Sequence, residues 1–392
     1  MERRTYREGD GEALARLMVA AFGGDIVYAR SYFDPRQNPR LDPGQVHVIE
    51  EDGEARASAT VLPMEVFVDG EPVPMGGVAA VMVDPAYRRR RYAGDLMRAA
   101  LYDMRERGVN LSLLSPFAHT FYRSFGYELA TEAVEYTLKP TDLPTDPEQG
   151  NLRAYREEDL PKMMGLHEAA AREHRLGARR SEAFWRKVLG REDTRAAVHD
   201  AGRGVDGYLV YKMSGHREGR EPARRLEVQE LVAGGPGARR GLVSFLAALD
   251  PDAFDVRHWT PRGEPLHPYL RSSYVDAKVE PDQMLRLVDV EGALRHLDAG
   301  TGAPLVLEVA DDAVPENAGE YTIGDGEVVR GAEASERVAL DVRQLAQLYA
   351  GYLPARQLAR YGLLEAASPG ALDLLEEHFP VGDPWLFVPD HF

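Results

Sequence analysis

The sequence predicts a mixed α/β protein built from successive modules, and three observations support this fold class. Residues 78–127 contain an apolar run, a basic turn, an amphipathic stretch and a second apolar run, which is the order of a β-α-β unit. Near residue 150 the residue pattern of the N terminus begins again. Beyond residue 283, short apolar runs precede helical stripes, as in an α+β domain. A chain of 392 residues is long enough for two or three such domains.

Composition narrows the possible functions. The chain has no cysteine, which excludes disulfides, zinc–thiolate sites and thiol catalysis. Its net charge of −17 argues against nucleic-acid binding and is compatible with a cationic substrate. No apolar stretch approaches the roughly 20 residues of a membrane span, and the N terminus lacks a signal-peptide pattern. We therefore expect a cytoplasmic protein with neither a nucleic-acid nor a membrane partner.

The first module begins with a strand or extended segment at 4–7 and a helix that Asp10 caps. Three short strands are expected next, with hairpin turns at Asp52-Gly53 and Asp69-Gly70. The expected strands, in order, are 46–50, 56–61 and 65–68. The β-α-β unit follows them, and a strand at 131–138 is expected to close this module.

The β-α-β unit carries the clearest chemistry. Val78–Val83 predicts a buried strand, which Asp84-Pro85 ends because proline cannot donate to a ladder. Arg88–Arg91 then leads into a helix whose apolar face contains Leu96, Met97, Ala100 and Leu101. The N terminus of a helix attracts phosphate through its free N–H groups and its dipole, and four arginines strengthen that attraction. The alternative is that the arginines form a solvated charge run.

Two motifs in this unit resemble those of the GNAT acetyltransferases. Val83-x-Pro85-x-Tyr87-Arg88-x-x-x-x-Ala93 is similar to their coenzyme A loop, R/Q-x-x-G-x-G/A. Phe121-Tyr122-x-x-Phe125-Gly126-Tyr127 is similar to a signature near the end of the same domain. One departure is that Arg91 stands where the first glycine of the loop falls. Either the loop differs there or the Arg91 side chain points away from the phosphates.

The second module repeats the first. After a linker at 140–150, Arg4-x-Tyr6-Arg7-Glu8-x-Asp10 recurs as Arg153-x-Tyr155-Arg156-Glu157-x-Asp159, an offset of 149 residues. Gly234-Gly235-Pro236-Gly237 replaces the arginine loop, and the aromatic signature has no counterpart. We therefore expect residues 1–140 to form a catalytic GNAT domain and residues 150–283 a GNAT-like domain without coenzyme chemistry.

The third module, residues 284–392, ends in an apolar tail, Pro384–Phe392, although chain ends are usually polar. Three such modules in this order resemble the Eis (enhanced intracellular survival) family, which has two GNAT-type mixed-sheet domains and a sterol carrier protein-like α+β domain. The resemblance implies acetyl transfer from acetyl-CoA to amines, often of aminoglycosides and at more than one position. It also implies a homo-hexamer described as a pair of trimers.

The resemblance also assigns the catalytic pair. It implies that Tyr122 is the general acid, and a phenol with a pKa near 10 can hold a proton for the departing thiolate at neutral pH. It implies that the C-terminal carboxylate, on Phe392 here, is the base that reaches the pocket of the catalytic domain. A core tyrosine and a purely hydrophobic anchor are the respective alternatives.

The remaining site residues follow the same resemblance. Coenzyme-binding residues are expected at Val81, Met82 and Val83, whose backbone N–H groups would polarise the thioester, and at Arg88, Arg89, Arg90, Arg91, Tyr92 and Ala93. Phe22, Asp25 and His391 are expected to contact the substrate. No residue spacing indicates a metal site.

These expectations combine into one functional prediction, an acetyl-CoA-dependent N-acetyltransferase that acts on primary amines of a cationic, aminoglycoside-like small molecule. Acetylation of protein lysines or polyamines is an alternative within the enzymes. A non-catalytic lipid-binding scaffold is the alternative from another class, because the third module resembles sterol carriers.

Overall fold

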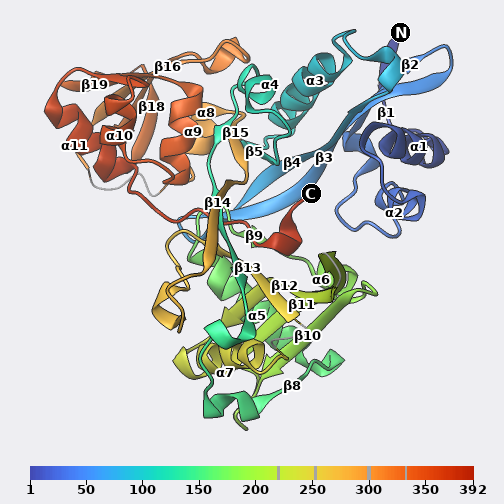
Figure 1. Ribbon diagram of the computed structural model, residues 1–392. Helices are drawn as coiled ribbons and strands as arrows, with labels where there is room; N and C mark the ends of the chain where they lie inside the picture. The colour runs from blue at the N-terminus through green and yellow to red at the C-terminus, as the bar shows by residue number, and fades with distance from the viewer. Residues whose placement is uncertain (219–220, 251–253, 298–301, 332) are drawn as a thin grey trace. The chain divides into compact units, whose positions relative to one another are not determined.

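The computed structural model describes residues 1–218, 221–250, 254–297, 302–331 and 333–392 (Figure 1). Contacts within the chain divide it into two units. The first unit comprises Met1–Thr131, Asp282–Gly382 and Phe392. The second comprises Glu132–Pro281 and Asp383–His391. No helix in the described ranges is long and apolar enough to cross a membrane.

The first unit contains a mixed sheet with the strand order β1-β2-β3-β4-β5-β15-β6. Figure 1 shows α1 and α3 on opposite sides of β3 and β4. The elements up to residue 131 are β1 (Glu2–Thr5), α1 (Asp10–Phe22), α2 (Ile26–Tyr32), β2 (Val46–Glu51), β3 (Glu54–Val68), β4 (Glu71–Val83), α3 (Tyr92–Glu106), β5 (Leu111–Leu114), α4 (His119–Arg123) and β6 (Glu128–Leu129).

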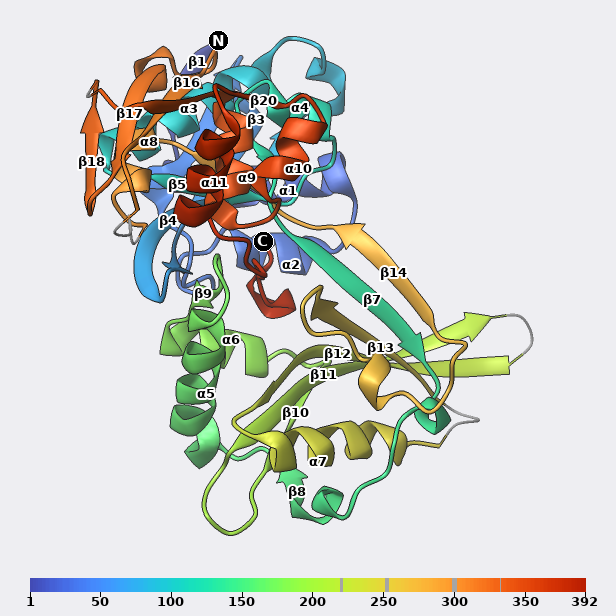
Figure 2. The ribbon, with the colours of Figure 1, turned by 90° about the vertical axis from the view of Figure 1, so that its left-hand side faces the viewer.

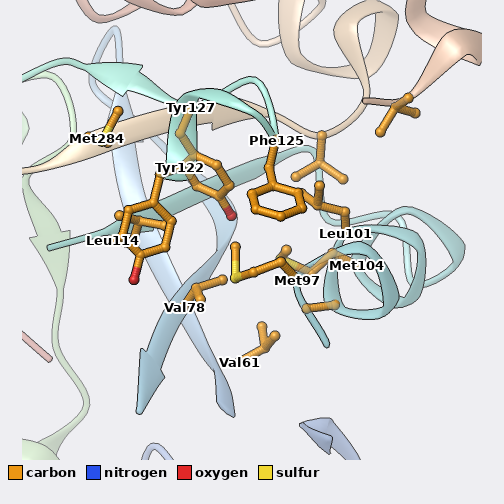
Figure 3. Packing of buried hydrophobic residues seen from close by; sticks show 13 residues of the cluster. Val61, Val78, Met97, Leu101, Met104, Leu114, Tyr122, Phe125, Tyr127 and Met284 are labelled. Carbon is orange, nitrogen blue, oxygen red and sulfur yellow. The ribbon is translucent and has the colours of Figure 1, made fainter. Parts of the chain in front are cut away.

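The core beside the catalytic motifs forms where α3 packs on the sheet. The apolar face of α3 inserts Met97, Ala100, Leu101 and Met104 between strand residues and the aromatic signature. Figure 3 shows Met97, Leu101 and Met104 in this position. The other residues of this core are also buried, among them Leu114, Tyr122, Phe125 and Tyr127. The spacing of the four α3 residues is that of one helical face, so the helix predicted from the sequence is packed as expected.

The last part of the first unit adds β15 (Met284–Leu287) to the same sheet and then forms a second sheet, ordered β18-β17-β16-β19-β20. The helix α9 packs against β15 and β6. After β15, the elements of this last part are α8 (Val290–Leu294), β16 (Leu305–Ala310), β17 (Gly319–Gly324), β18 (Glu327–Arg330), β19 (Glu336–Asp341), α9 (Val342–Ala350), α10 (Ala355–Arg360), β20 (Leu364–Ala366) and α11 (Pro369–His378).

The second unit has its own mixed sheet, ordered β14-β7-β13-β12-β11-β10-β8. Figure 2 shows α7 lying along this sheet, where it packs on β11 and β12. The elements are β7 (Glu132–Leu138), β8 (Leu152–Ala154), α5 (Leu160–Arg172), β9 (Ala178–Arg179), α6 (Glu182–Leu189), β10 (Thr194–His199), β11 (Gly207–Glu218), β12 (Glu221–Ala233), α7 (Pro236–Ala247), β13 (Phe254–Pro261) and β14 (Asp276–Pro281).

The sequence repeat corresponds to a repeated structural detail. In the first unit Arg4 pairs with Asp10 at 2.6 Å, and the Asp10 carboxylate accepts the backbone N–H of Arg7. In the second unit Arg153 pairs with Asp159 at 2.7 Å, and the Asp159 carboxylate accepts the backbone N–H of Arg156. The same offset therefore preserves both a salt bridge and a turn, which supports duplication of the fold.

Four sequence expectations need correction. The strands expected at 56–61 and 65–68 are one strand, β3, because Pro63 is accommodated opposite Gly76. The strand expected at 131–138 to close the first module is β7 of the second sheet. The run from Met284 supplies β15 to the first sheet, since an apolar pattern predicts a strand but not its neighbour.

The fourth correction concerns the start of α1. Asp10 is the first residue of this helix and Gly9 precedes it as the cap, with φ 98°. The Asp10 carboxylate accepts the backbone N–H of Arg7, which lies before the helix, and so it does not cap the helical N–H groups.

Candidate active site

The strands β4 and β5 pair in parallel over only three residues each and then separate. Their register joins Met75–Gly77 to Leu111–Leu113, after which β4 continues to Val83 and β5 ends at Leu114. Within the extended part of β4, Ala80 has a φ of 47°, and Ala80 and Val81 lie opposite a single residue of β3, Ala59. This is a β-bulge, a device that changes the direction of backbone and side-chain groups in a strand.

The coenzyme-loop residues gather at the open end of this gap. A cavity of about 600 Å³ is lined by all nine residues predicted to bind the coenzyme, Val81, Met82, Val83, Arg88, Arg89, Arg90, Arg91, Tyr92 and Ala93. It adjoins the start of α3, whose first N–H groups have no partner within the helix. This end of α3 is therefore suited to an anion such as a pyrophosphate.

Arg91 takes the conformation that a glycine would provide. It precedes α3 with φ 68° and ψ 5°, in the left-handed region, and its side chain is exposed. Arg89 is also left-handed, with φ 64°. The backbone of the loop thus has a glycine-type geometry although arginine occupies the position.

The four arginines are not equivalent. Arg90 lies 3.2 Å from the Glu51 carboxylate and its guanidinium stacks 4.6 Å from the ring centre of Tyr87. The hydroxyl of Tyr92 donates to Glu51, and this hydrogen bond lowers the pKa of that carboxyl. Within the described part of the chain, no carboxylate pairs with Arg88, Arg89 or Arg91. These three cations remain available to a bound anion.

Tyr122 lies on α4, directly after the loop that follows β5. Its side chain is 4% exposed and is surrounded by the rings of Phe117, Phe121 and Tyr127, with ring centres 5.3, 5.0 and 6.2 Å away. Figure 3 shows it beside Leu114 and Tyr127. Burial raises the pKa of Tyr122 to about 12, so the phenol holds its proton throughout the neutral range.

The aromatic signature needs a glycine at position 126 for steric reasons. Gly126 has φ 78°, which favours glycine, and a Cβ there would overlap the guanidinium of Arg286. Arg286 is fully buried and pairs with Asp311. The turn that presents Tyr122 is therefore packed directly on a buried ion pair.

A second cavity, of about 410 Å³, contains both members of the predicted catalytic pair. Tyr122 and the terminal residue Phe392 line it, together with the predicted substrate residues Phe22 and Asp25. The ring of Phe392 lies on Gly77, because a Cβ at Gly77 would come within 2.8 Å of the ring carbon Cζ. Three residues, Phe22, Val81 and Phe117, line both this cavity and the cavity of the predicted coenzyme-binding residues, which we call the coenzyme cavity. The two cavities therefore adjoin.

His391 has a different environment from its neighbour in sequence. It groups with the second unit, where its Nε2 lies 3.1 Å from the carbonyl oxygen of Leu386. Its predicted contact with substrate stays a prediction.

Sequence reasoning missed several residues of the second cavity. Tyr28 and Tyr32 lie four residues apart on α2, a helix begun by Asp25, which accepts the backbone N–H of Val27 at 2.8 Å. Phe117 and Ser115 come from the loop after β5. The i, i+4 tyrosines after a Gly-Gly pair are a signal that could have indicated this helix.

The second unit contains a corresponding gap that is differently filled. Its β12 and β13 pair in parallel from Arg224↔Phe254 to Val228↔His258 and then separate. The remaining cavity there is about 110 Å³, and Trp385 and Phe387 of the C-terminal segment line it. The backbone N–H of Trp385 donates to the Arg175 carbonyl at 3.1 Å. The chain's own tail therefore lies at the second gap.

A buried ion network holds this segment in the second unit. The guanidinium of Arg180, fully buried, donates to Asp390 at 2.7 and 2.8 Å and to Glu230 at 2.5 and 3.1 Å. Burial, the largest single influence, would raise the pKa of Glu230, but the interactions with Arg180 and His167 together outweigh it and leave the pKa at about 2. Tyr208 also donates to Glu230. All members of the network are thus charged or hydrogen-bonded.

Comparisons with known proteins agree with these domains. Residues 2–130 match a family model described as an acetyltransferase (GNAT) domain, and residues 176–287 match another with the same description. Residues 290–387 match a sterol carrier protein domain.

Relatives and solved structures cover nearly the whole chain. An uncharacterized N-acetyltransferase of Streptomyces avermitilis is 26% identical over 87% of each chain, and one of Streptomyces coelicolor is 27% identical over 95% of each. The structure of a GCN5-related N-acetyltransferase from Kribbella flavida has a TM-score of 0.84 at 25% identity over the full length of both chains. A GCN5-related N-acetyltransferase from Anabaena variabilis, with a TM-score of 0.88 at 23% identity over both full lengths, shows the shared fold.

The chain is a GNAT N-acetyltransferase with two tandem GNAT domains and a C-terminal sterol carrier protein domain. The structure of Eis1 from Mycobacterium abscessus matches it over the full length of both chains, with a TM-score of 0.80 at 25% identity. The resemblance to the Eis family stated from the sequence is confirmed.

Proposed function

We propose that this enzyme transfers the acetyl group of acetyl-CoA directly to a primary amine of a cationic small molecule, with Tyr122 as general acid and the Phe392 carboxylate as base. The observation that carries the proposal is that Tyr122 and Phe392 line one cavity, which shares Phe22, Val81 and Phe117 with the cavity of the coenzyme loop. An amine in the first cavity would meet a thioester at that shared wall.

The coenzyme cavity fits acetyl-CoA by its chemistry. Arg88, Arg89 and Arg91 and the N-terminal N–H groups of α3 would hold the pyrophosphate, and the apolar wall of β4 would accompany the rest of the molecule. When bound, acetyl-CoA supplies the activated acetyl group. The bulge at Ala80 and Val81 frees backbone groups from the ladder, and their N–H groups would polarise the acyl carbonyl.

The two catalytic groups divide the proton transfers. The Phe392 carboxylate attracts the ammonium and takes its proton, directly or through water, so that the neutral amine can attack. Tyr122, protonated at neutral pH because burial raises its pKa to about 12, donates to the departing thiolate. Serine, cysteine or metal chemistry is not needed for this scheme.

The proposal is tested by a thiol-release assay with acetyl-CoA and a panel of amines. The panel contains aminoglycosides, polyamines and lysine peptides, the acceptor classes expected from the sequence, and also arylalkylamines. Amine-dependent thiol release, with the acetylated product seen by mass spectrometry, is the expected result. Acetyl-CoA binding without transfer to any primary amine would overturn it.

The proposal extends to assembly. The homo-hexamer implied by the Eis resemblance predicts a mass six times 43.5 kDa in solution. Light scattering after size-exclusion chromatography measures it, and a monomer or dimer would contradict it.

A further inference from the structure

The cavity that contains Tyr122 and Phe392 is mainly aromatic. Its six aromatic residues are Phe22, Tyr28, Tyr32, Phe117, Tyr122 and Phe392. Three of them are unusually exposed, Phe22 at 60%, Tyr28 at 59% and Phe117 at 72%. Exposed aromatic rings gathered around one cavity are typical of a binding surface rather than of a solvated one.

The same cavity offers few negative charges. Among its lining residues, the acidic groups are Asp25 and the terminal carboxylate of Phe392. One Asp25 oxygen already accepts the Val27 N–H at 2.8 Å as the cap of α2. The remaining lining is apolar, glycine, or the hydroxyls of serine and tyrosine.

This combination discriminates between acceptor classes. A polycation would place several ammonium groups near a wall that can neutralise one or two of them, and an unpaired charge loses hydration without a compensating partner. A molecule with one ammonium and a flat apolar body would meet the terminal carboxylate with its charge. Its body would stack among the rings, which also attract cations over their faces.

Resting on the proposed function, we infer that the acceptor is an arylalkylamine-like monoamine, an aromatic or flat apolar body with one primary amine, rather than a polycationic aminoglycoside or polyamine. Tyr28 is a specificity-determining residue, because it lines this cavity and not the coenzyme cavity. Its ring centre lies 6.4 Å from that of Tyr32, so the two rings form one wall from α2.

The first experiment compares 2-phenylethylamine and tryptamine with spermidine and kanamycin. For the full-length enzyme, kcat/KM of the arylalkylamines is expected to exceed that of both polycations at least tenfold. Equal values, or preference for kanamycin or spermidine, would overturn the inference.

Two variants sharpen the test. Tyr28→Ala should raise KM for 2-phenylethylamine about tenfold, with little change in kcat or in KM for acetyl-CoA, because it removes stacking and not chemistry. Tyr28→Glu should shift the preference toward spermidine by adding a carboxylate. Tyr361→Ala, at another exposed tyrosine of the first unit, is the matched control and should change nothing. Unaltered preference in both Tyr28 variants would contradict the assignment.

Calorimetric titration of the amines into the protein saturated with coenzyme A separates this inference from the proposed function. Tighter binding of 2-phenylethylamine than of spermidine supports the acceptor class even if no thiol is released, an outcome in which only the proposed reaction fails. Equal or weaker binding of 2-phenylethylamine overturns the acceptor class, whatever the assay shows.

Discussion

The two GNAT domains contain the same gap between parallel strands and fill it differently. In the first, β4 and β5 separate after Gly77 and leave adjoining cavities of about 600 and 410 Å³. In the second, β12 and β13 separate after Val228, and the cavity is about 110 Å³ beside Trp385 and Phe387. One fold thus leaves room for the proposed substrate site where the gap stays open, and it binds the C-terminal segment of the chain where side chains fill the gap.

The arginines at the two gaps also differ, because among the described residues carboxylates pair with those at the second gap and not with three of those at the first. Arg88, Arg89 and Arg91 precede α3 with no carboxylate partner in the described ranges. In the second unit, by contrast, Arg239 pairs with Glu264 at 3.1 Å and Arg240 with Asp146 at 3.2 Å. Pairing cancels the positive field that a phosphate would need. The second gap therefore differs from the first in charge as well as in space.

The largest effect is expected from Tyr122→Phe, which removes the proposed acid from the open gap. kcat should fall about 1,000-fold, within the range of general acid catalysis, with little change in KM for acetyl-CoA. Because burial raises the pKa of Tyr122 to about 12, the wild-type kcat should not decline through loss of this proton between pH 8 and about 10. Stopped-flow thiol release measures both, with Tyr102→Phe, a partly exposed tyrosine on α3, as control. Full activity of Tyr122→Phe would remove the acid from the mechanism.

The next effect concerns the filled gap. Asp390→Asn leaves Arg180 with Glu230 alone and should destabilise the second unit by about 2–3 kcal/mol, less than loss of an entire buried pair. All three tryptophans, Trp185, Trp259 and Trp385, belong to this unit, so their fluorescence during urea unfolding reports on it selectively.

The matched control for Asp390→Asn is Glu168→Gln, which breaks a half-exposed pair with Arg172 on α5 and should change stability by less than about 0.5 kcal/mol. If the two variants unfolded at the same urea concentration, the network would not hold the tail.

The difference in charge between the two gaps predicts an effect on KM for acetyl-CoA, and this effect is smaller than the two effects above. Replacing Arg88 and Arg89 by alanine should raise KM for acetyl-CoA about tenfold, since two exposed ionic contacts together contribute roughly 1–2 kcal/mol. The same double replacement at Arg239 and Arg240 should leave this KM unchanged, because both are already paired. Equal effects of the two double variants would show that the comparison of charges is wrong.

The motifs predicted those parts of the site whose residues lie close together in the sequence. Val81–Val83 and Arg88–Ala93 are nearly contiguous, so these nine residues of the coenzyme cavity could be predicted from one stretch of sequence. Tyr28, Gly77 and Phe117 are distant in sequence, and only the pairing of β4 with β5 and the placing of α2 bring them together. No periodicity contains that information.

The strands show the same limit. The apolar runs that begin at residues 131 and 284 do contain strands, but β7 joins the second sheet and β15 the first. Alternation of side chains determines that a segment is extended and which face is buried, and the choice of neighbour depends on packing across the whole sheet.

The smallest effect concerns Arg91. A left-handed conformation costs a non-glycine residue about 1 kcal/mol, so Arg91→Gly should stabilise the protein by up to about that amount. Arg98→Gly, at an exposed interior position of the same helix α3, should destabilise it by about 1 kcal/mol. Thermal unfolding followed by circular dichroism compares them. Destabilisation by both would mean that the Arg91 side chain itself stabilises the loop.

The central claim is that the terminal carboxylate and the Tyr122 phenol act on one substrate, and moving the carboxylate by one residue tests it most directly. A protein extended by a single glycine after Phe392 keeps the ring and shifts the charge by about 3.8 Å, the spacing of successive Cα atoms. Phe392→Leu keeps the carboxylate and changes the ring. We predict that kcat falls at least 100-fold in the extended protein and less than tenfold in Phe392→Leu, with KM for acetyl-CoA unchanged in both. Wild-type turnover by the extended protein would contradict the account.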